Sequence, residues 1–494
     1  MLHSSDAPSG IRRPLGMLLV VMTLTSTSLA QLSLDASGEQ MRMDVAQSTI
    51  TPHPDQADTY NVVLVTLNDN GNHPNPGFRQ WWHAEISGFE GDRDTKLLVT
   101  VGPVGYREVV LPVWSLDGED YERIPETPIS VERRGSEEFL HRFTVVVPAG
   151  VRSVRLSKYF PYTVTQKLHW IASIQDDPRV RVNISGASRQ GRAIIRLDIT
   201  DPATPPTHKQ RVWIHSMVHP GETTSMFLLE GLVGFLLSGT PEAETLLRGT
   251  IFNLYPMVNP DGVVAGNYRT SLNNTNLEDE WEAPYQSSEP EIHGLQRDLF
   301  EFMGTVENPA PNPIRILLNL HAAGGNYPFH FVHQPLWTKP GDLGVNQEVY
   351  ELEKRWVATF RARSEFVRRG YSIPSRLRRG NTRPFVEAAL FDLYSSRPEW
   401  TSGDNPQPPV MGITFEGTYR LGPTGAWAVP DDYRQTGHEM ALAISDFLGL
   451  TPEGLAPAPN DEPATPPDEP DDDDTPTTGT MPLGRPIPPS ADGY

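Results

Sequence analysis

The feature that most constrains the fold is a set of short apolar runs between residues 161 and 450. The runs 211–215, 251–257 and 314–320 are almost continuous in aliphatic and aromatic residues, which is typical of strands buried on both faces. Residues 225–237 instead place their apolar side chains on one face at helical spacing. Strands that alternate with helices predict an α/β domain with a mostly parallel or mixed sheet flanked by helices.

The part of the chain that precedes this domain has a different pattern. Residues 60–66, 96–101, 108–111 and 142–147 are short runs rich in Val and Leu, and Gly, Pro and Asp separate them. Runs of this length bounded by turn residues are typical of strands joined by short connections. We therefore expect a small antiparallel β-sandwich domain over residues 31–160.

The composition narrows the possible functions. A chain of 494 residues is too long for one ordinary core, in agreement with two domains. The formal net charge of -21 argues against nucleic-acid or anionic-membrane partners and is better suited to a positively charged substrate. The chain has no cysteine, so disulfides, thiol nucleophiles and cysteine-ligated metals are all excluded. Any metal site must be built from His and carboxylates.

The two ends of the chain carry their own signals. Residues 1–30 combine Arg12 and Arg13, an apolar run and a small-residue site at Ala30, which is the order of a cleaved secretory signal. The alternative is an uncleaved anchor, although the run is shorter than the roughly 20 residues that span a bilayer. These features predict a secreted or periplasmic protein with no membrane span after signal cleavage. Residues 451–494 are acidic and Pro-rich, which predicts a disordered tail.

The first chemical signal is the sequence His219-Pro220-Gly221-Glu222 between the predicted strand 211–215 and the predicted helix. Ligands of α/β sheets gather where strands end, and an imidazole and a carboxylate three residues apart in a turn can face one cation. The alternative is a surface His followed by a Glu that the helix dipole favours.

Two further side chains end apolar runs in the same domain. His321 follows the run 314–320, and Glu416 ends the run that begins at Ile413. His321 could complete a His, Glu, His set that leaves a position open for water, as catalytic zinc requires. Glu416 could then act as general acid and base. Taken singly, His321 could be a core histidine and Glu416 an edge-strand surface residue, but three such signals at strand ends reinforce one another.

The stretch 255–271, which reads Tyr-Pro-Met-Val-Asn-Pro-Asp-Gly-Val-Val-Ala-Gly-Asn-Tyr-Arg-Thr-Ser, resembles the zinc carboxypeptidases. Within them it is similar to the cytosolic carboxypeptidase-like subfamily, whose N-terminal β domain resembles the segment that ends in Phe-Pro-Tyr-Thr at 160–163. The similarity covers roughly residues 55–450, and the stretch 219–269 is its most diagnostic part. It implies a carboxypeptidase-type mixed sheet for the predicted catalytic domain, residues 161–450.

The resemblance also implies roles for individual residues. The zinc ligands match His219, Glu222 and His321, for one Zn²⁺ ion, and the general acid and base matches Glu416. Arg269 matches the arginine that stabilises the oxyanion. The mobile substrate-contacting tyrosine is best matched by Tyr394, with Tyr371 as a weaker candidate.

One departure concerns how the substrate is recognised. The family usually has Asp-Leu-Asn-Arg-x-Trp, whose Asn and Arg bind the free C-terminal carboxylate, whereas residues 276–281 read Asn-Leu-Glu-Asp-Glu-Trp. The acidic residues Glu278 and Asp279 would repel a terminal carboxylate. A second departure is Asn319, where the family commonly has Asp, which alters the support of the third ligand.

Three hypotheses remain. The chain is a zinc hydrolase with altered specificity, whose Glu278, Asp279 or Glu280 contacts a cationic or uncharged group of a peptide or amide substrate. Or it is a conventional carboxypeptidase in which Arg297, or an arginine of 376–379, replaces the clamp. The alternative from another class is a catalytically weak zinc-binding protein that binds peptides or cell-wall fragments. Retention of Arg269 and Glu416 favours an enzyme.

Overall fold

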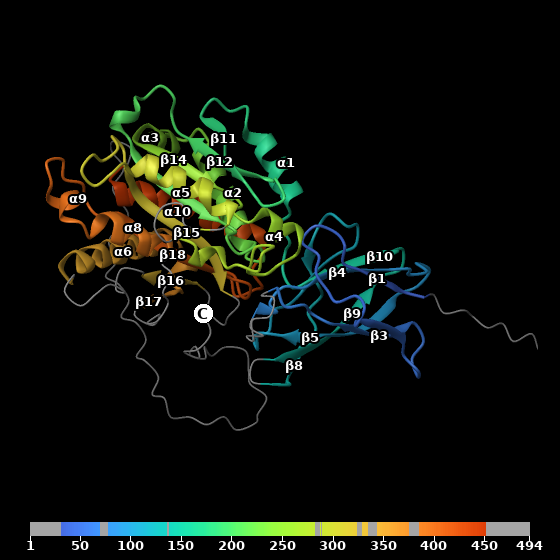
Figure 1. Ribbon diagram of the computed structural model, residues 1–494. Helices are drawn as coiled ribbons and strands as arrows, with labels where there is room; N and C mark the ends of the chain where they lie inside the picture. The colour runs from blue at the N-terminus through green and yellow to red at the C-terminus, as the bar shows by residue number, and fades with distance from the viewer. Residues whose placement is uncertain are drawn as a thin grey trace, which may run out of the picture.

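The computed structural model describes residues 31–69, 78–135, 138–281, 287, 289–323, 329–333, 343–374 and 385–450. The predicted signal segment and the predicted tail therefore lie outside the described residues. The strands of the first part, drawn in blue to cyan, form one body beside a larger body of strands and helices (Figure 1). No helix among the described residues has the length and apolar character needed to cross a bilayer.

Two five-stranded sheets build the N-terminal body. The first has the order β1-β4-β10-β6-β7 and the second the order β2-β3-β5-β9-β8. Their strands are β1 (Ser33–Asp35), β4 (His83–Ser87), β10 (Ser153–Ser157), β6 (Val113–Ser115) and β7 (Glu122–Arg123), and β2 (Thr49–Pro52), β3 (Thr59–Leu64), β5 (Thr95–Val104), β9 (Phe139–Val147) and β8 (Ser130–Arg133). Described neighbours in these sheets run antiparallel, except that β3 pairs with β5 in parallel.

The two sheets share one apolar core. Leu97 and Val99 of β5 and Ala84 and Ile86 of β4 are buried in the same cluster, because alternate side chains of each strand face inward. The predicted β-sandwich is therefore present, apart from the parallel pair. The predicted strand over 108–111 is not formed: this segment is irregular and buries its apolar side chains without pairing, and the strand β6 begins after Pro112.

The larger body is built on one mixed sheet of eight strands, as the sequence predicts. Its order is β11-β12-β14-β13-β15-β18-β16-β17. The strands are β11 (Val180–Ala187), β12 (Ala193–Ile199), β14 (Thr250–Tyr255), β13 (Gln210–Ser216), β15 (Ile314–Ala323), β18 (Met411–Thr418), β16 (His330–His333) and β17 (Tyr371–Pro374). The central strands β14, β13, β15 and β18 run parallel to their neighbours in that series. Their carboxyl ends therefore meet at one edge of the sheet.

Helices cover both faces of this sheet. The α-helices are α1 (Val164–Ile174), α2 (Thr224–Leu236), α3 (Pro241–Gly249), α4 (Pro260–Val264), α5 (Pro290–Met303), α6 (Leu343–Arg363), α7 (Glu365–Arg368), α8 (Val386–Leu390), α9 (Pro398–Ser402) and α10 (Pro430–Leu448). Shorter turns of helix are η2 (Pro206–His208), η3 (Leu277–Asp279) and η6 (Phe391–Ser395). Helices α2, α6 and α10 share a core with one face, and α5 and α8 share a core with the other.

The alternation of side chains along β15 assigns them to these faces. Ile316 and Leu318 lie in the core with α2 and α10, whereas Leu317 lies in the core with α5 and α8. Because successive side chains of a strand point to opposite faces, Asn319 and His321 follow Leu317 on the α5 and α8 face. The last of these, His321, reaches the end of the strand.

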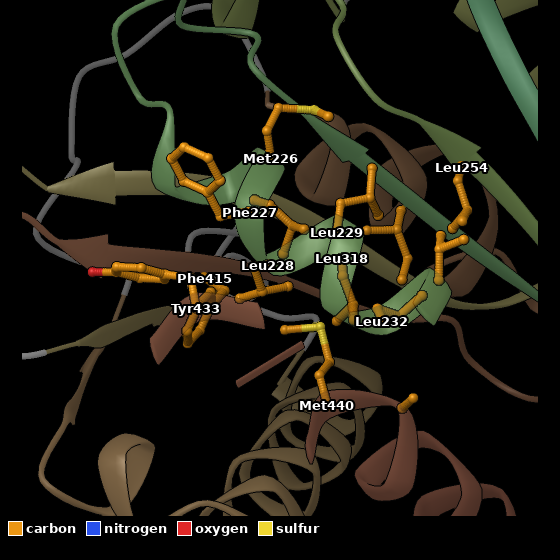
Figure 2. Packing of buried hydrophobic residues seen from close by; sticks show 14 of the residues in the cluster. Met226, Phe227, Leu228, Leu229, Leu232, Leu254, Leu318, Phe415, Tyr433 and Met440 are labelled. Atoms are coloured by element: carbon orange, nitrogen blue, oxygen red, sulfur yellow. The ribbon is translucent and has the colours of Figure 1, made fainter. Parts of the chain in front are cut away.

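Helix α2 is buried between the sheet and α10. Figure 2 shows Met226, Phe227, Leu228, Leu229 and Leu232 of α2 among Leu318, Phe415 and Met440. The two helices approach so closely that a Cβ atom on Gly231 would lie 1.8 Å from the carbonyl oxygen of Arg434. Glycine is therefore required there, and α2, which follows the His219 turn, is held firmly against the core.

The two bodies meet around a buried lysine. Lys158 follows β10 and is 1% exposed, and its ammonium lies 4.4 Å from the ring centroids of both Tyr106 and Tyr419. Its Nζ has no hydrogen-bond partner among the described residues. Burial lowers the pKa of Lys158 from 10.5 to about 7. The contact of a cation with two rings offsets part of the desolvation cost.

This lysine predicts a pH-dependent stability. The folded pKa lies below the unfolded one, so unfolding takes up a proton between about pH 7 and pH 10, and stability should rise with pH across that window. In the Lys158→Met variant this rise should disappear. Thermal unfolding of both proteins at several pH values measures it, with Lys96→Met on β5 as the control. Parallel curves for the wild type and Lys158→Met would contradict the interpretation.

Candidate metal centre

The turn between β13 and α2 carries the first two predicted ligands. Backbone bonds from Val258 to Ser216 (3.1 Å) and from Asn259 to Met217 (3.1 Å) fix where β13 ends. Gly221 then packs on the neighbouring loop, where its N–H donates to the carbonyl of Tyr268 at 2.9 Å and an added Cβ would lie 2.7 Å from the Tyr268 ring. The polar side chains of the turn, His219 and Glu222, are buried at 2% and 3% exposure. Burial of polar side chains is costly unless they have partners, so these two are held in place by specific contacts.

The three predicted ligands converge on one point. Glu222 Oε1 lies 2.9 Å from His219 Nδ1, and Glu222 Oε2 lies 2.8 Å from His321 Nδ1. The two Nδ1 atoms are 3.0 Å apart. The structure thus brings His219, Glu222 and His321 together from the ends of β13 and β15. Donors at these separations can all reach one ion at the usual zinc distances of about 2.0–2.2 Å.

The tautomers of the two histidines fit a cation at this point. His219 Nε2 lies 2.9 Å from Asn276 Oδ1, an acceptor that also receives the N–H of Glu278 at 3.3 Å. His321 Nε2 lies 3.2 Å from a carboxylate oxygen of Glu278. With the proton on each Nε2, which faces these oxygen acceptors, each Nδ1 presents a lone pair to the point where the ligands converge. Two lone pairs and a carboxylate facing one another repel unless a cation lies among them.

The charges around the centre support the same conclusion. Burial lowers the pKa of His321, but the carboxylates of Glu278 and Glu222 outweigh burial and raise it well above its ordinary value. Burial raises the pKa of Glu278, but His321 outweighs it and lowers the pKa to about 2. Without a metal, a proton on His321 supplies the positive charge that two buried carboxylates require. A divalent cation supplies it in the same place.

Glu278 adds a fourth group to the centre. Ligand atoms of His219, Glu278 and His321 lie within 4.8 Å of one another, so these three residues form a possible metal site. The carboxylate oxygens of Glu222 lie 2.9 Å from His219 Nδ1 and 2.8 Å from His321 Nδ1, which is also within 4.8 Å. The residues present, two imidazoles and carboxylates, fit Zn²⁺ in either combination.

Arg269 lies beside the centre on a loop that the N-terminal body holds. Its charge, second to burial, lowers the pKa of His219. The backbone N–H groups of Arg269 and Thr270 donate to Asp69 Oδ2 at 2.6 and 3.0 Å. Asp69, from the N-terminal body, is 2% exposed.

A second link between the N-terminal body and the centre is Gln40, whose Nε2 donates to the carbonyl of Pro220 at 2.9 Å. The sequence analysis missed both residues, because their partners are about two hundred positions away.

Glu416 stands next to the third ligand. In the parallel pair of β15 and β18, Glu416 is the direct partner of His321. Paired residues of neighbouring strands point to the same face, so the Glu416 carboxylate lies on the His321 side of the sheet. Glu416 is 7% exposed, whereas the alternative of an edge-strand surface residue requires an open position. Strand β18 lies between β15 and β16, which excludes that alternative.

The structure holds Tyr394 by contacts within the core. Tyr394 is 4% exposed in the core formed with α5 and α8, and its ring packs edge-on against Trp400. Its hydroxyl donates to the carbonyl of Gly304 at 3.1 Å. These contacts give the side chain a packing role, and its contact with a substrate stays a prediction. The side chain of the weaker candidate, Tyr371, is outside the described side chains.

The acidic segment 276–281 also differs from what the sequence suggests. Glu278 is 2% exposed, and Asp279 accepts the amide of Asn276 at 2.8 Å. Glu280 accepts the hydroxyl of Ser287 at 2.8 Å. The proposed substitute clamp Arg297 donates to Asp298 and to the carbonyl of Ser185, both at 2.8 Å. The arginines of 376–379 lie outside the described residues.

Part of the chain is similar to a known protein family and to curated proteins. Residues 168–350 match the family model described as zinc carboxypeptidase. Mouse cytosolic carboxypeptidase 6 is 29% identical over 259 residues, which cover 50% of this chain and 47% of the relative. Zebrafish (Danio rerio) cytosolic carboxypeptidase 2 is 32% identical over 168 residues, which cover 33% of this chain and 23% of the relative. The chain thus spans about half the length, or less, of these curated relatives.

The comparison corrects the prediction of export. The curated relatives are named cytosolic carboxypeptidases, so the predicted secreted or periplasmic protein with a signal peptide is wrong on this finding.

A solved structure extends the similarity to most of the chain. The metallocarboxypeptidase from Burkholderia cenocepacia superposes with a TM-score of 0.65 at 20% identity, covering 85% of this chain and 99% of that one. At this level of identity the likeness shows the fold alone. Residues 168–350 therefore match the zinc carboxypeptidase family model, and the chain has the metallocarboxypeptidase fold.

Proposed function

We propose that this chain is a zinc-dependent metallocarboxypeptidase-like hydrolase that cleaves a peptide or amide bond. The observation that carries the proposal is the convergence of the two Nδ1 atoms of His219 and His321, 3.0 Å apart, each within 2.9 Å of one carboxylate oxygen of Glu222. Two neutral imidazoles and one carboxylate are the protein ligands of many hydrolytic zinc sites, where a further position stays open. We assign His219, Glu222 and His321 as the ligands.

The chain's own residues supply the rest of the chemistry. When bound, zinc lowers the pKa of a water molecule towards about 7 and polarises a carbonyl. The Glu416 carboxylate accepts the proton of the attacking water and returns it to the nitrogen that leaves. The Arg269 guanidinium donates hydrogen bonds to the oxyanion that develops on the carbonyl oxygen. Water and the amide are thereby converted into a carboxylate and an amine.

The acidic segment bears on the substrate. The positions that match the family's carboxylate-binding Asn and Arg hold Glu278 and Asp279, two negative charges. Arg297 is engaged with Asp298, so it offers no obvious replacement. We therefore propose that the scissile bond lies next to a cationic or uncharged group. This supports altered specificity over conventional exopeptidase action.

The first prediction from the proposed function concerns Glu416. The Glu416→Gln variant should bind zinc as the wild type does and lose turnover by on the order of 100-fold or more, because the amide cannot accept the proton. Metal analysis and peptide hydrolysis followed by mass spectrometry measure both quantities. Glu439→Gln on α10 is the control and should remain active. An active Glu416→Gln enzyme would disprove the assigned role.

The second prediction concerns the substrate. The zinc-loaded protein should cleave peptides that have an amidated C-terminus, or a Lys beside the scissile bond, in preference to matched peptides with a free acid, because the acidic segment repels a carboxylate. Mass spectrometry of paired peptides gives the ratio of kcat/KM. Preference for the free acid would show that another cation replaces the clamp. Binding of zinc without cleavage of any peptide would favour a binding protein.

The third prediction concerns Asp69, which holds the loop of Arg269. Asp69→Ala removes the acceptor of two backbone N–H groups, so kcat should fall on the order of 10–100-fold with little change in KM, because the displaced guanidinium acts in the transition state. Asp69→Asn keeps one acceptor oxygen and should restore part of the rate.

The control is Asp44→Ala, which removes a carboxylate that bonds Gln47 within its own loop of the N-terminal body. It should leave kcat unchanged. If Asp69→Ala and Asp44→Ala gave the same kcat as the wild type, the N-terminal body would have no part in orienting Arg269.

A further inference from the structure

One short segment faces the outer nitrogens of both histidine ligands. Asn276 and the turn η3 (Leu277–Asp279) pass beside the two histidines. Asn276 Oδ1 lies 2.9 Å from His219 Nε2, and Glu278 Oε2 lies 3.2 Å from His321 Nε2. A single turn thus contacts Nε2 of each ring, while Nδ1 of each ring faces Glu222, where the metal would be held.

A further hydrogen bond orients the side chain in each of these two contacts. Asn276 Nδ2 donates to Asp279 Oδ2 at 2.8 Å, which fixes the direction of the amide and leaves Oδ1 for the histidine. Asn319 Nδ2 donates to Glu278 Oε1 at 2.7 Å, which leaves Oε2 for the other histidine. Asp279 therefore acts on His219 through Asn276, and Asn319 acts on His321 through Glu278.

The burial of Glu278 indicates that its carboxylate contacts a metal ligand rather than a substrate. Glu278 is 2% exposed, and its Oε2 forms an ion-pair contact of 3.2 Å with His321 Nε2, although neither atom has a hydrogen-bond partner among the described residues. A buried carboxylate without any partner costs several kcal/mol, so this contact with His321 is the interaction that compensates the charge of Glu278. The charge of Glu278 is thus committed to His321 before any substrate arrives.

We propose that Glu278 and Asp279 are positioning residues of the metal centre, which hold the rings of His321 and His219 through their Nε2 atoms. A carboxylate on the outer N–H of a metal-binding imidazole fixes the ring and its tautomer and makes the ligand more basic. The segment that in similar proteins recognises a terminal carboxylate here strengthens the hold on the metal. The inference rests on the proposed zinc site and deepens it.

The test is zinc affinity, measured by competition with a chelator on the full chain. Glu278→Gln should weaken binding about 10–100-fold, and Asp279→Asn, which acts through Asn276, should weaken it less. Both changes preserve shape, and thermal unfolding of the metal-free proteins checks that they fold. Glu280→Gln is the matched control, because that carboxylate belongs to the same segment but accepts from Ser287. It should bind zinc as the wild type does.

Two outcomes would overturn the proposal. Unchanged zinc affinity in Glu278→Gln and Asp279→Asn, with an altered KM for peptides, would mean that the two residues contact substrate. A changed visible spectrum of the Co²⁺-loaded Glu278→Gln protein would mean that Glu278 is itself a ligand, whereas the proposal expects an unchanged ligand set. A wild type that binds no zinc would instead refute the proposed function, which separates the two failures.

Discussion

The rest of the structure depends on the meeting of two imidazole lone pairs and a carboxylate at the ends of two parallel strands. His219 and His321 face each other at 3.0 Å between their Nδ1 atoms, an arrangement that is unfavourable without a positive charge. It persists because β13 and β15 are hydrogen-bonded neighbours in the middle of the sheet and because α2 is packed tightly behind the turn. The unfavourable approach of these groups is thus maintained by the packed strands β13 and β15 and by helix α2.

The N-terminal body takes part in the same site. Gln40 binds the carbonyl of Pro220 inside the ligand turn, and Asp69 binds the backbone of Arg269. Gly221, between His219 and Glu222, donates its N–H to the carbonyl of Tyr268 and so joins these two loops to each other. The orientation of the proposed metal ligands and of the guanidinium is therefore set partly by residues of the N-terminal body. Lys158 joins the two bodies, because its ammonium contacts the rings of Tyr106 and Tyr419. Since burial lowers the pKa of Lys158, the stability of this contact depends on pH.

The sequence was sufficient for the fold and for the positions of the main groups, because both depend on local patterns. Apolar runs identify β13, β14 and β15, and a polar residue that ends such a run, like His321 or Glu416, must lie at the edge where ligands bind. Tyr394 could not be placed in this way, since only the tertiary structure shows its hydroxyl on Gly304. The same holds for Asp69 and Asn276, whose roles depend on partners distant in the chain. The roles of the ligands, of Arg269 and of Glu416 stay predictions.

The electrostatic balance of the centre explains why the acidic segment is compatible with a metal and unfavourable for a substrate carboxylate. A divalent cation is neutralised by two buried carboxylates, those of Glu222 and Glu278. The next carboxyl group, Glu387, accepts the hydroxyl of Thr414 at 2.7 Å, and burial and then the charge of Glu278 raise its pKa to about 7. Burial is the larger cause of this shift, and the charge of Glu278 adds to it. In the proposed function a free C-terminal carboxylate would bring a further negative charge near Glu278, whereas an amide or an ammonium group would not, so the residue that contacts His321 would also bear on which substrates can approach.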